Sequence, residues 1–423
     1  MRVLVVGSGA REHAMAWKLA ASPSVNEVLA APGNPGTAAV GENIAVSAGD
    51  VAGLVELAQR RAVDLVVVGP EAPLADGVVD ALEAVGVSVF GPSRAAAQLE
   101  SSKGFSKHFM KRFGIPTADF AVFDDPAAAK AWVRERGQPM VVKADGLAAG
   151  KGVVVADTVE QTLEAIDRLM VARAHGDAGA KVVVEERLQG PEVSFHVVCD
   201  GARGVALAAA QDHKRLEEGD RGPNTGGMGA YSPPPMVTPE LEVRILRDVV
   251  TPTLDGMNEL GTPFRGALFV GLMIVDGQPK VLEYNVRFGD PETEVMLSRW
   301  SGDVLPLLLG AARGDLSGVE AQWDAPAALC VVLASEGYPG RSVIGLEIEG
   351  IAEAGAIEGV QVFHAGTRIF EDRLVSSGGR VLCVTATGRD VEEASSRAYA
   401  AVDLITLEGA QHRRDIGWQA RSA

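Results

Sequence analysis

Short β-branched runs alternate with longer helical patterns through the first hundred residues, and this alternation constrains the fold more than any other feature. The runs are VLVV (3–6), EVLA (27–30), LVVVG (65–69) and VSVFG (87–91). Strands that are joined by crossover helices pair in parallel and are covered by helices on both faces. We therefore predict an N-terminal α/β domain, residues 1–100, with a doubly wound parallel sheet. Its ligands should gather at the carboxyl ends of the strands.

Three loops lie at that edge: GSGAREH (7–13), APGNPGT (31–37) and GPEAPLADG (69–77). The first loop partly matches a dinucleotide-binding turn, which would indicate a dehydrogenase. However, Glu12 stands where the third glycine is required, and no acidic residue closes the second strand. Nicotinamide binding is therefore disfavoured. A turn that binds a smaller phosphate, and glycines with only a structural role, both remain open.

The remaining chain reads as α+β. We predict a second unit over 101–324, with a small lid subdomain at about 115–190, and a small α+β domain over 325–423 in which no chemistry stands out. Asp276-Gly277 is a strong hairpin signal between two apolar stretches. The following features are also predicted: helices over 93–113 and 238–260, a hairpin joining strands at 140–144 and 153–156, and a long polar loop over 211–235.

The net charge of the chain limits the classes of binding partner that we expect. The chain has 423 residues with 39 Lys+Arg against 56 Asp+Glu, a net charge of −17. Such a surface repels nucleic acids and acidic membranes, so we expect neither as a partner. Only three cysteines occur, in no disulfide or zinc spacing, and no apolar run reaches the ~20 residues of a spanning helix. We expect a cytoplasmic protein that is a monomer or a weak homodimer.

The segment KADGLAAGKG (143–152) resembles a phosphate-binding P-loop but is not one. Three residues rather than four separate Gly146 from Gly150, and Gly152 stands where Ser or Thr should reach magnesium. What remains is a lysine that ends one strand and a glycine-rich turn that leads into the next. Its N–H groups can wrap a phosphate and Lys143 can place a charge on it. A solvated hairpin is the alternative.

The string LEYNVRFGDPE (282–292) is the strongest candidate for chemistry. Glu283 and Asn285 alternate along one strand, so both point to the same face and offer oxygen atoms to a hard divalent cation. Arg287 continues that face. This arrangement suits magnesium that bridges nucleotide phosphates, with the arginine stabilising a transferring phosphoryl group. A structural ion pair is the alternative.

Two further segments are weaker on their own. VVVEERLQGPE (182–192) ends a buried strand with two carboxylates, where backbone groups could pair with adenine and Glu192 with a ribose. Solvated charges are the alternative reading. QDHKR (211–215) and NTGGMG (224–229) bracket the polar loop, which could close over an anionic substrate. His213 could be a general base, but beside lysine and arginine we expect it to be solvated or to bind phosphate.

Several strings occur together in the order and spacing of one family. SSKGFSKHFM, KADGLAAGKGVVVA, QDHKR, GPNTGGMGAYSP and EYNVRFGDPE make the chain similar, over essentially its full length, to the phosphoribosylamine-glycine ligase family of ATP-grasp enzymes. The resemblance implies that ATP is held between two α+β subdomains with Mg²⁺ or Mn²⁺. It also implies that glycine is joined to 5-phosphoribosylamine through glycyl phosphate, in purine synthesis. The loops at 146–152 and 211–230 would then exclude water.

The resemblance also implies residue roles. The nucleotide would contact Lys103, Lys143, Gly150, Lys151, Gly152, Glu185, Glu186, Leu188 and Glu192. The substrates would contact Gly9, Asn34, Glu71, Asp212, Lys214, Gly226 and Gly227. Arg287 and Asp212 would be catalytic, and Glu283 and Asn285 would hold the metal. Many ATP-grasp enzymes have another carboxylate on the preceding strand, but Gly271-Leu272-Met273 stands there. Two rivals remain: an ATP-grasp ligase for another acid and amine, and a nucleotide sensor without turnover.

Overall fold

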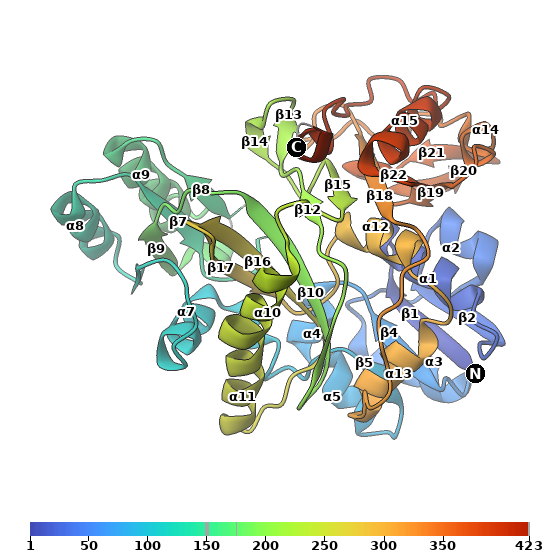
Figure 1. Ribbon diagram of the computed structural model, residues 1–423, viewed down its shortest axis with the longest axis horizontal. Coiled ribbons are helices and arrows are strands. Elements are labelled where there is room, and N and C mark those ends of the chain that lie inside the picture. The colour runs from blue at the N-terminus through green and yellow to red at the C-terminus, as the bar shows by residue number, and fades with distance from the viewer. Residues whose placement is uncertain (149–151, 175, 422–423) are drawn as a thin grey trace.

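The N-terminal domain is a parallel five-stranded sheet of order β3-β2-β1-β4-β5. The computed structural model describes residues 1–148, 152–174 and 176–421 (Figure 1). Val3 and Val5 of β1 enter a core with helix α1, whereas Leu4 and Val6 enter a separate core with helices α3 and α5. Cores on both faces confirm the doubly wound prediction. The elements are β1 (Arg2–Gly7), α1 (Ala10–Ala20), β2 (Glu27–Pro32), α2 (Pro35–Val40), β3 (Glu42–Asn43), α3 (Val51–Arg60), β4 (Leu65–Val68), α4 (Glu71–Asp76), α5 (Val78–Glu83) and β5 (Ser88–Phe90).

A small four-stranded sheet, β6-β9-β7-β8, forms the next unit. It packs two helices and has its own hydrophobic core, which includes Val142, Ile166 and Val184. Strand β7 pairs antiparallel with β8, so the glycine-rich segment joins the two strands of a hairpin as predicted. The elements are β6 (Phe120–Phe123), α8 (Pro126–Arg136), β7 (Met140–Ala144), β8 (Val153–Val155), α9 (Val159–Ile166), a π-helical turn (Asp167–Val171), a 3₁₀ turn (Gly176–Gly179) and β9 (Val182–Glu186).

The helical stretch predicted over 93–113 is two helices, α6 (Gln98–Ser101) and α7 (Lys103–Arg112). The break has a local cause. Ser102 leaves the helical conformation, with φ −137°, and its hydroxyl accepts a hydrogen bond from the backbone N–H of Phe105 as the N-cap of α7. The second helix therefore starts anew after Ser102, and its first residue is Lys103.

A second antiparallel sheet has the order β11-β10-β16-β17. Together with the small sheet it gives the two α+β subdomains that the resemblance implies. The predicted turn at Asp276-Gly277 joins β16 to β17, and both of its residues have positive φ, 49° and 74°. The elements are β10 (Glu192–Asp200), β11 (Gly204–Ala206), α10 (Pro239–Ile245), a π-helical turn (Leu246–Val250), α11 (Thr251–Glu259), β16 (Arg265–Val275) and β17 (Gln278–Asn285).

The C-terminal sheet corrects one prediction. Its order is β12-β15-β18-β22-β19, so two of its strands come from the segment 211–235 that we expected to be a loop. The side chains of Ala230 and Tyr231 in β15 are fully buried there. The strands are β12 (Gln211–Asp212), β13 (Arg215–Glu217), β14 (Arg221–Asn224), β15 (Gly229–Ser232), β18 (Ala327–Ala334), β19 (Val360–His364), β20 (Thr367–Phe370), β21 (Arg373–Ser376) and β22 (Arg380–Gly388). The helices are α12 (Glu292–Arg299), α13 (Leu305–Arg313), α14 (Ile351–Gly355), α15 (Val391–Val402) and α16 (Trp418–Arg421).

The three cysteines, Cys199, Cys330 and Cys383, are free thiols and buried. Among the described helices, none combines the length and the apolar composition that crossing a membrane requires.

Candidate active site

A buried carboxylate holds two lysines between the small sheet and α7. Glu185, at the end of β9, is 2% exposed and forms ion pairs with Lys107 and Lys143, each at 2.6 Å. Lys143 Nζ also donates to the carbonyl oxygen of Leu282, at 2.9 Å, in β17 of the second antiparallel sheet. Burial lowers the pKa of Lys107 to about 8, although Glu185 opposes that effect. The triad therefore links the two subdomains and presents positive charge at their junction.

Glu283 and Asn285 lie near the end of β17, on one face of the strand as predicted. Burial by itself raises the pKa of Glu283, but Lys214, Lys143 and Lys103 outweigh burial and hold that pKa below its usual range. Within the described ranges, no residue donates a hydrogen bond to the Glu283 carboxylate. A charged, unpaired carboxylate beside an amide oxygen is a donor set that suits a hard divalent cation.

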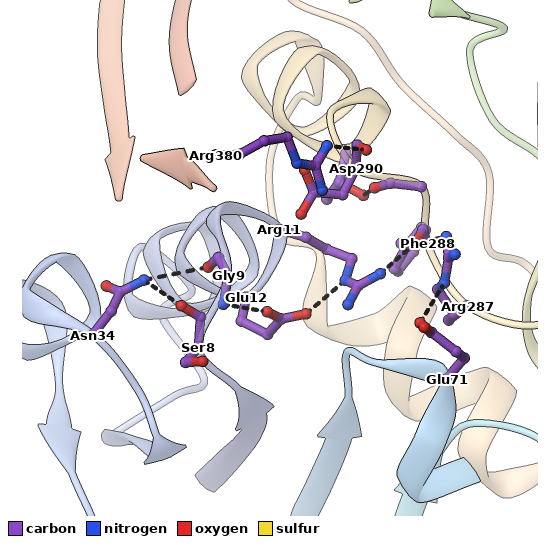
Figure 2. A network of polar contacts seen from close by, with 12 residues as sticks. Ser8, Gly9, Arg11, Glu12, Asn34, Glu71, Arg287, Phe288, Asp290 and Arg380 are labelled. Atoms are coloured by element: carbon purple, nitrogen blue, oxygen red, sulfur yellow. Dashed lines mark hydrogen bonds and ion pairs between the residues drawn. The ribbon is translucent and has the colours of Figure 1, made fainter. Parts of the chain in front are cut away.

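Arg287 follows on the same face and is held by acidic groups from the N-terminal part of the chain. Its guanidinium contacts Glu71 at 3.3 Å (Figure 2). It also contacts Glu100 at 3.2 Å, and its Nη2 donates to Asn285 Oδ1 at 3.2 Å. Burial lowers the pKa of Arg287, but Glu100 and Glu71 raise it above its ordinary value. The arginine is therefore charged and fixed in place beside the side-chain oxygen of Asn285.

Asp212 and Lys214 enter the same area from β12 and the residues that follow it. Lys214 Nζ lies 3.0 Å from Glu192 Oε2 on β10. Burial would lower the pKa of Lys214, but Glu192, Glu283 and Asp212 raise it. Burial, and then the negative charge of Glu292, raise the pKa of Asp212 well above its ordinary value. Lys214 thus interacts with three acidic groups, Glu192, Glu283 and Asp212, and Asp212 also interacts with Glu292.

The glycine-rich loop before β15 is fixed by groups of the C-terminal domain. The Gly226 N–H donates to the Tyr338 hydroxyl at 2.9 Å, and Arg380 Nη1 donates to the Gly226 carbonyl at 2.8 Å. Arg380 also pairs with Asp290 Oδ1 at 3.0 Å (Figure 2). Gly227 has φ +114°, and a Cβ there would lie 2.7 Å from Asp212 Oδ1, so this position requires glycine.

The glycine-rich turn at residues 7–9 is filled by the side chain of Glu12, from the helix α1 that follows it. Glu12 Oε2 accepts a hydrogen bond from the Gly9 N–H at 2.5 Å, and Arg11 pairs with Glu12 Oε1 at 2.6 Å (Figure 2). A Cβ at Gly69 would lie 2.0 Å from Glu12 Oε1, which shows how closely the carboxylate packs between the strand ends. A negative carboxylate at this point opposes a dinucleotide pyrophosphate, which agrees with the departure seen in the sequence.

Asn34 has a structural role in the described chain. Its Oδ1 accepts from the N–H groups of Gly36 and Thr37 as the N-cap of α2, and its Nδ2 donates to Ser8 at 2.9 Å and His364 at 2.7 Å. These bonds tie the turn at 7–9 to the C-terminal domain. The side chain is 5% exposed and its polar atoms are already occupied, so it shapes the loop edge.

His213 is not the solvated or phosphate-binding residue that we expected. It is 1% exposed, and its Nε2 lies 3.0 Å from Gln419 Oε1 and accepts from the Gly417 N–H at 3.2 Å. Burial lowers its pKa to about 4. The imidazole is therefore neutral and packs beneath the C-terminal segment.

The remaining predicted nucleotide ligands lie along the edge of the small sheet. Lys103 begins α7 and is half-buried, Glu186 ends β9, and Leu188 follows it, half-buried. Gly152 closes the hairpin, where its carbonyl accepts from the Ala144 N–H at 2.8 Å. The predicted ligands Gly150 and Lys151 lie outside the described residues.

Sequence reasoning missed Lys107, Glu100, Glu292 and Arg380. Lys107 had a signal, because it stands one helical turn after Lys103 and shares its face. Arg380 had none. It stands in a strand of the C-terminal region, in which we saw no chemistry, and only the fold brings it to Gly226 and Asp290.

Comparison with known proteins assigns the family. Three family models cover the chain: the N domain of phosphoribosylglycinamide synthetase at residues 1–100, its ATP-grasp (A) domain at 101–293 and its C domain at 328–419. A phosphoribosylamine–glycine ligase of Brucella melitensis is 52% identical over 420 residues, 99% of this chain and 98% of that protein. One of Xanthomonas axonopodis pv. citri is 53% identical over 424 residues, with the same shares.

Solved structures agree. The phosphoribosylamine–glycine ligase of Thermotoga maritima superposes with a TM-score of 0.86 at 37% identity, covering 99% of this chain and 100% of that one. The biotin carboxylase domain of Hydrogenobacter thermophilus 2-oxoglutarate carboxylase gives 0.73 at 18% identity, with 97% and 91% covered, which shows a shared fold alone. From the models, the relatives and the fold together, the chain belongs to the phosphoribosylamine–glycine ligase family of ATP-grasp enzymes.

Proposed function

We propose that this protein joins glycine to 5-phosphoribosylamine with ATP, giving glycinamide ribonucleotide, ADP and phosphate, in purine biosynthesis. The observation that carries the proposal is the cluster at the end of β17. Lys103, Lys143 and Lys214 surround Glu283, and Arg287 lies beside Asn285. Convergent cations next to oxygen ligands suit the stabilisation of a transferring phosphoryl group. The relatives that are named for this reaction match along nearly the whole chain.

The nucleotide would lie between the small sheet and the β10–β17 sheet. Lys103, Lys143 and the glycine-rich hairpin with Gly150, Lys151 and Gly152 would contact the phosphates. The Glu185 side chain is already paired with two lysines, so adenine would meet backbone groups near Glu186 and Leu188. Glu192 would accept a hydrogen bond from a ribose hydroxyl and would share its carboxylate between that hydroxyl and Lys214.

Glu283 and Asn285 would hold Mg²⁺ or Mn²⁺. Bound there, the ion would neutralise charge on the triphosphate. The chain's own residues supply the rest. Arg287, which Glu71 and Glu100 hold in place, would contact the moving phosphoryl group. Gly271 stands opposite Glu283 on β16, so this strand offers no further carboxylate at that level.

The substrates would meet the turn at Gly9, the α4 terminus at Glu71 and the loop at Gly226 and Gly227, with Asp212 and Lys214 alongside. Asn34 would contribute by shaping that edge, since its side-chain atoms are taken up by Gly36, Thr37, Ser8 and His364. With these roles, the amine and the acid would lie between the N-terminal domain and the C-terminal sheet.

A carboxylate does not react with an amine directly, because oxide is too poor a leaving group. Transfer of the γ-phosphoryl group to glycine would give glycyl phosphate. The amine of phosphoribosylamine would then attack its carbonyl and displace phosphate. This scheme asks the protein for positioning and charge stabilisation and for no protein nucleophile, which fits a site of lysines, arginines and carboxylates. The hairpin at 146–152 and the loop with β13 and β14 would exclude water.

The test is product formation. We expect release of ADP and phosphate to require glycine and 5-phosphoribosylamine together, with glycinamide ribonucleotide identified by mass. Phosphate release with another acid and amine, but not with this pair, would favour a ligase of different specificity. ATP binding without turnover would favour a sensor, and nicotinamide binding a dehydrogenase.

The domain limits at 100 and 324, a monomeric or weakly dimeric state and a cytoplasmic location stay predictions. Analytical ultracentrifugation tests the second of these.

A further inference from the structure

A buried cluster of metal-binding side chains that the proposed reaction does not use lies between helix α12 and strand β22. One carboxylate oxygen each of Asp290 and Glu294 and the sulfur of Cys383 lie within 4.8 Å of one another. Asp290 precedes α12, Glu294 is in the first turn of that helix, and Cys383 lies within β22. The fold brings these residues together from distant parts of the chain, so their spacing in the sequence gives no sign of the cluster.

Glu294 is the member of the cluster that most needs a ligand. It is fully buried, and neither of its carboxylate oxygens receives a hydrogen bond from any other described residue. One of these oxygens is directed at the cluster, within 4.8 Å of Asp290 and Cys383. Buried carboxylates in proteins are normally paired with a cation or coordinate a metal, because an isolated buried charge is costly. A metal ion in the cluster would satisfy this side chain.

Asp290 also retains a free oxygen, although Arg380 lies beside it. Arg380 Nη1 is 3.0 Å from Asp290 Oδ1 (Figure 2). Its hydrogen bonds, however, go to the backbone carbonyls of Gly226 at 2.8 Å and Asp290 at 2.7 Å. Asp290 Oδ1 is buried and receives no hydrogen bond from the described chain. The Asp290 side chain is 13% exposed, so it gives an ion a route from solvent into the cluster.

The sulfur of Cys383 selects the class of ion. Cys383 is fully buried, and the thiol of Cys330, on the neighbouring strand β18, hydrogen-bonds with it. Thr385 lies two residues further along the same face of β22, is fully buried, and its hydroxyl has no hydrogen-bond partner among the described residues. Mg²⁺ and Ca²⁺ prefer oxygen ligands, whereas a thiolate favours Zn²⁺ and similar transition-metal ions.

The charge of the cluster favours a divalent ion. A thiol that coordinates a metal loses its proton, so the two carboxylates and Cys383 would together carry three negative charges. A divalent ion and the Arg380 guanidinium would balance these charges. Zn²⁺ bonds oxygen and sulfur at about 2.0–2.3 Å, so small side-chain rotations would bring the three ligand atoms to one ion.

We propose that Asp290, Glu294 and Cys383 form a structural site for Zn²⁺ or a similar transition-metal ion, which fastens α12 to the C-terminal sheet. Its donor set includes sulfur and so differs from the oxygen pair of Glu283 and Asn285. The ion would fix the segment that connects β17 to α12, at a distance from the triphosphate. This site goes beyond the proposed ligation and does not depend on it.

The experiment uses the full chain after its metals have been removed with a chelator. The protein is titrated with Co²⁺ and then Zn²⁺, in excess Mg²⁺ that occupies sites made of oxygen alone. We expect one equivalent of Co²⁺ to give the thiolate-to-cobalt charge-transfer band in the near-ultraviolet, and Zn²⁺ to abolish it by displacement. Zn²⁺ should also raise the melting temperature, because an ion that binds only the folded state stabilises it.

Cys383→Ala should abolish the cobalt band and weaken Zn²⁺ binding by at least about 100-fold, since even residues that only support a metal ligand change affinity by about 10- to 100-fold. Cys199→Ala is the matched control, because it removes another fully buried thiol, in β10 and outside the cluster. This control should keep the band and the affinity for Zn²⁺.

Glu294→Gln tests the same site if thermal unfolding shows that Cys383→Ala does not fold. We expect it to weaken Zn²⁺ binding by about 10-fold or more. The metal-free protein carries the cost of the unpartnered carboxylate, so glutamine should stabilise that form. It should also remove most of the stabilisation that Zn²⁺ gives to the wild type.

Three results would overturn the assignment. Absence of the band at millimolar Co²⁺ would show that the cluster is a protonated polar pocket. A band of equal intensity in Cys383→Ala would place the sulfur ligand elsewhere. Unchanged affinity for Zn²⁺ in both Cys383→Ala and Glu294→Gln would place the ion at another site. None of these results bears on whether ATP cleavage requires glycine and 5-phosphoribosylamine, so failure of the metal site and failure of the proposed function are distinguishable.

Discussion

At the scale of single residues, the site is a set of charges that are stable only in one another's presence. Glu185 is buried between Lys107 and Lys143, and Glu283 stays ionised because lysines surround it. Removing one member of such a set leaves the others unpaired, and a buried unpaired charge is costly. Substitutions here should therefore change both activity and stability, and the two effects need separate measurements.

Glu283→Ala should reduce ligation by about 1,000-fold or more, the scale expected when a main electrostatic contact to a transferring group is lost. Turnover measured against magnesium concentration checks this. Glu259→Ala, on the surface helix α11, is the control and should behave as wild type. Wild-type turnover of Glu283→Ala at ordinary magnesium concentration would refute its role as a metal ligand.

Lys143→Ala should raise the KM for ATP by about 10-fold or more and also lower the unfolding free energy by about 3–5 kcal/mol, because Glu185 loses one of two buried partners. Initial rates and urea denaturation measure the two effects. The exposed Lys181, which precedes β9, supplies the control Lys181→Ala. An unchanged affinity for ATP would exclude Lys143 from the nucleotide site.

Glu294→Gln should stabilise the protein. This α12 residue is fully buried, and its two carboxylate oxygens receive no hydrogen bond from the described chain. Burial and the charge of Asp290 raise its pKa well above the ordinary value. Burial therefore disfavours the charged form of this carboxyl group, and glutamine avoids that cost. We expect the melting temperature to rise by a few degrees, since 1 kcal/mol shifts it by about 2–4 °C in larger domains. Calorimetry with a drop instead of a rise would contradict the account.

Roles that depend on neighbouring residues were predictable from the sequence, whereas contacts between residues far apart in the chain were not. The oxygen pair Glu283 and Asn285 follows from strand alternation, and Arg287 from the same face. The pairing of Arg287 with Glu71 and Glu100 could not be predicted, because it joins residues almost two hundred positions apart or more. Asn34 shows the converse. We predicted this loop residue as a substrate ligand, but its side-chain amide caps helix α2.

At the scale of elements, the loop 224–229 shows how tightly β12, α12 and β22 converge. Gly227→Ala would place a Cβ 2.6 Å from Pro291 and 2.7 Å from Asp212, at a φ of +114°. We expect a loss of stability of about 1–3 kcal/mol from backbone strain, and a drop in turnover because Asp212 is displaced. Gly261→Ala, in the exposed turn after α11, has φ +72° and nothing within 4 Å of the added Cβ. This control should cost stability but not turnover.

Regular elements with local signals were predicted well, and those made by distant pairing were not. The Asp276-Gly277 hairpin and the N-terminal alternation depend on neighbouring residues. Strands β12 and β15 are only two and four residues long. β15 is a strand because it pairs with β18, about a hundred positions later, and β12 is one because it pairs with β15. A glycine-rich polar segment gives no sign of that partner, so the sequence predicted a loop.

At the scale of the whole molecule, three buried histidines and one half-buried histidine set the response to acid. Burial lowers the pKa of His13 and His196 to about 3 and that of His213 and His364 to about 4. The unfolded chain takes up protons below about pH 6.5, whereas the folded protein does not, so stability falls as pH decreases through that window. Each histidine contributes up to roughly 1.4 kcal/mol per pH unit.

We therefore expect the urea midpoint to decrease between pH 7 and pH 5. Asp212 and Glu294 act in the opposite direction, because their raised pKa values make the folded state hold protons that the unfolded state releases. Glu294→Gln removes one of these and should steepen the decrease. A flat profile for both proteins would contradict the neutral state of the histidines.

The sheet β12-β15-β18-β22-β19 has a consequence for biosynthesis on the ribosome. Strand β15 ends at Ser232, but its partner, the central strand β18, begins at Ala327, and the neighbour of β18, strand β22, ends only at Gly388. While the intervening polypeptide is being translated, the edge of β15 that will meet β18 has no neighbour, and unpaired strand edges promote association between chains. The nascent protein therefore depends on protection of this segment, by chaperones or by its own hairpin, until the last strands emerge.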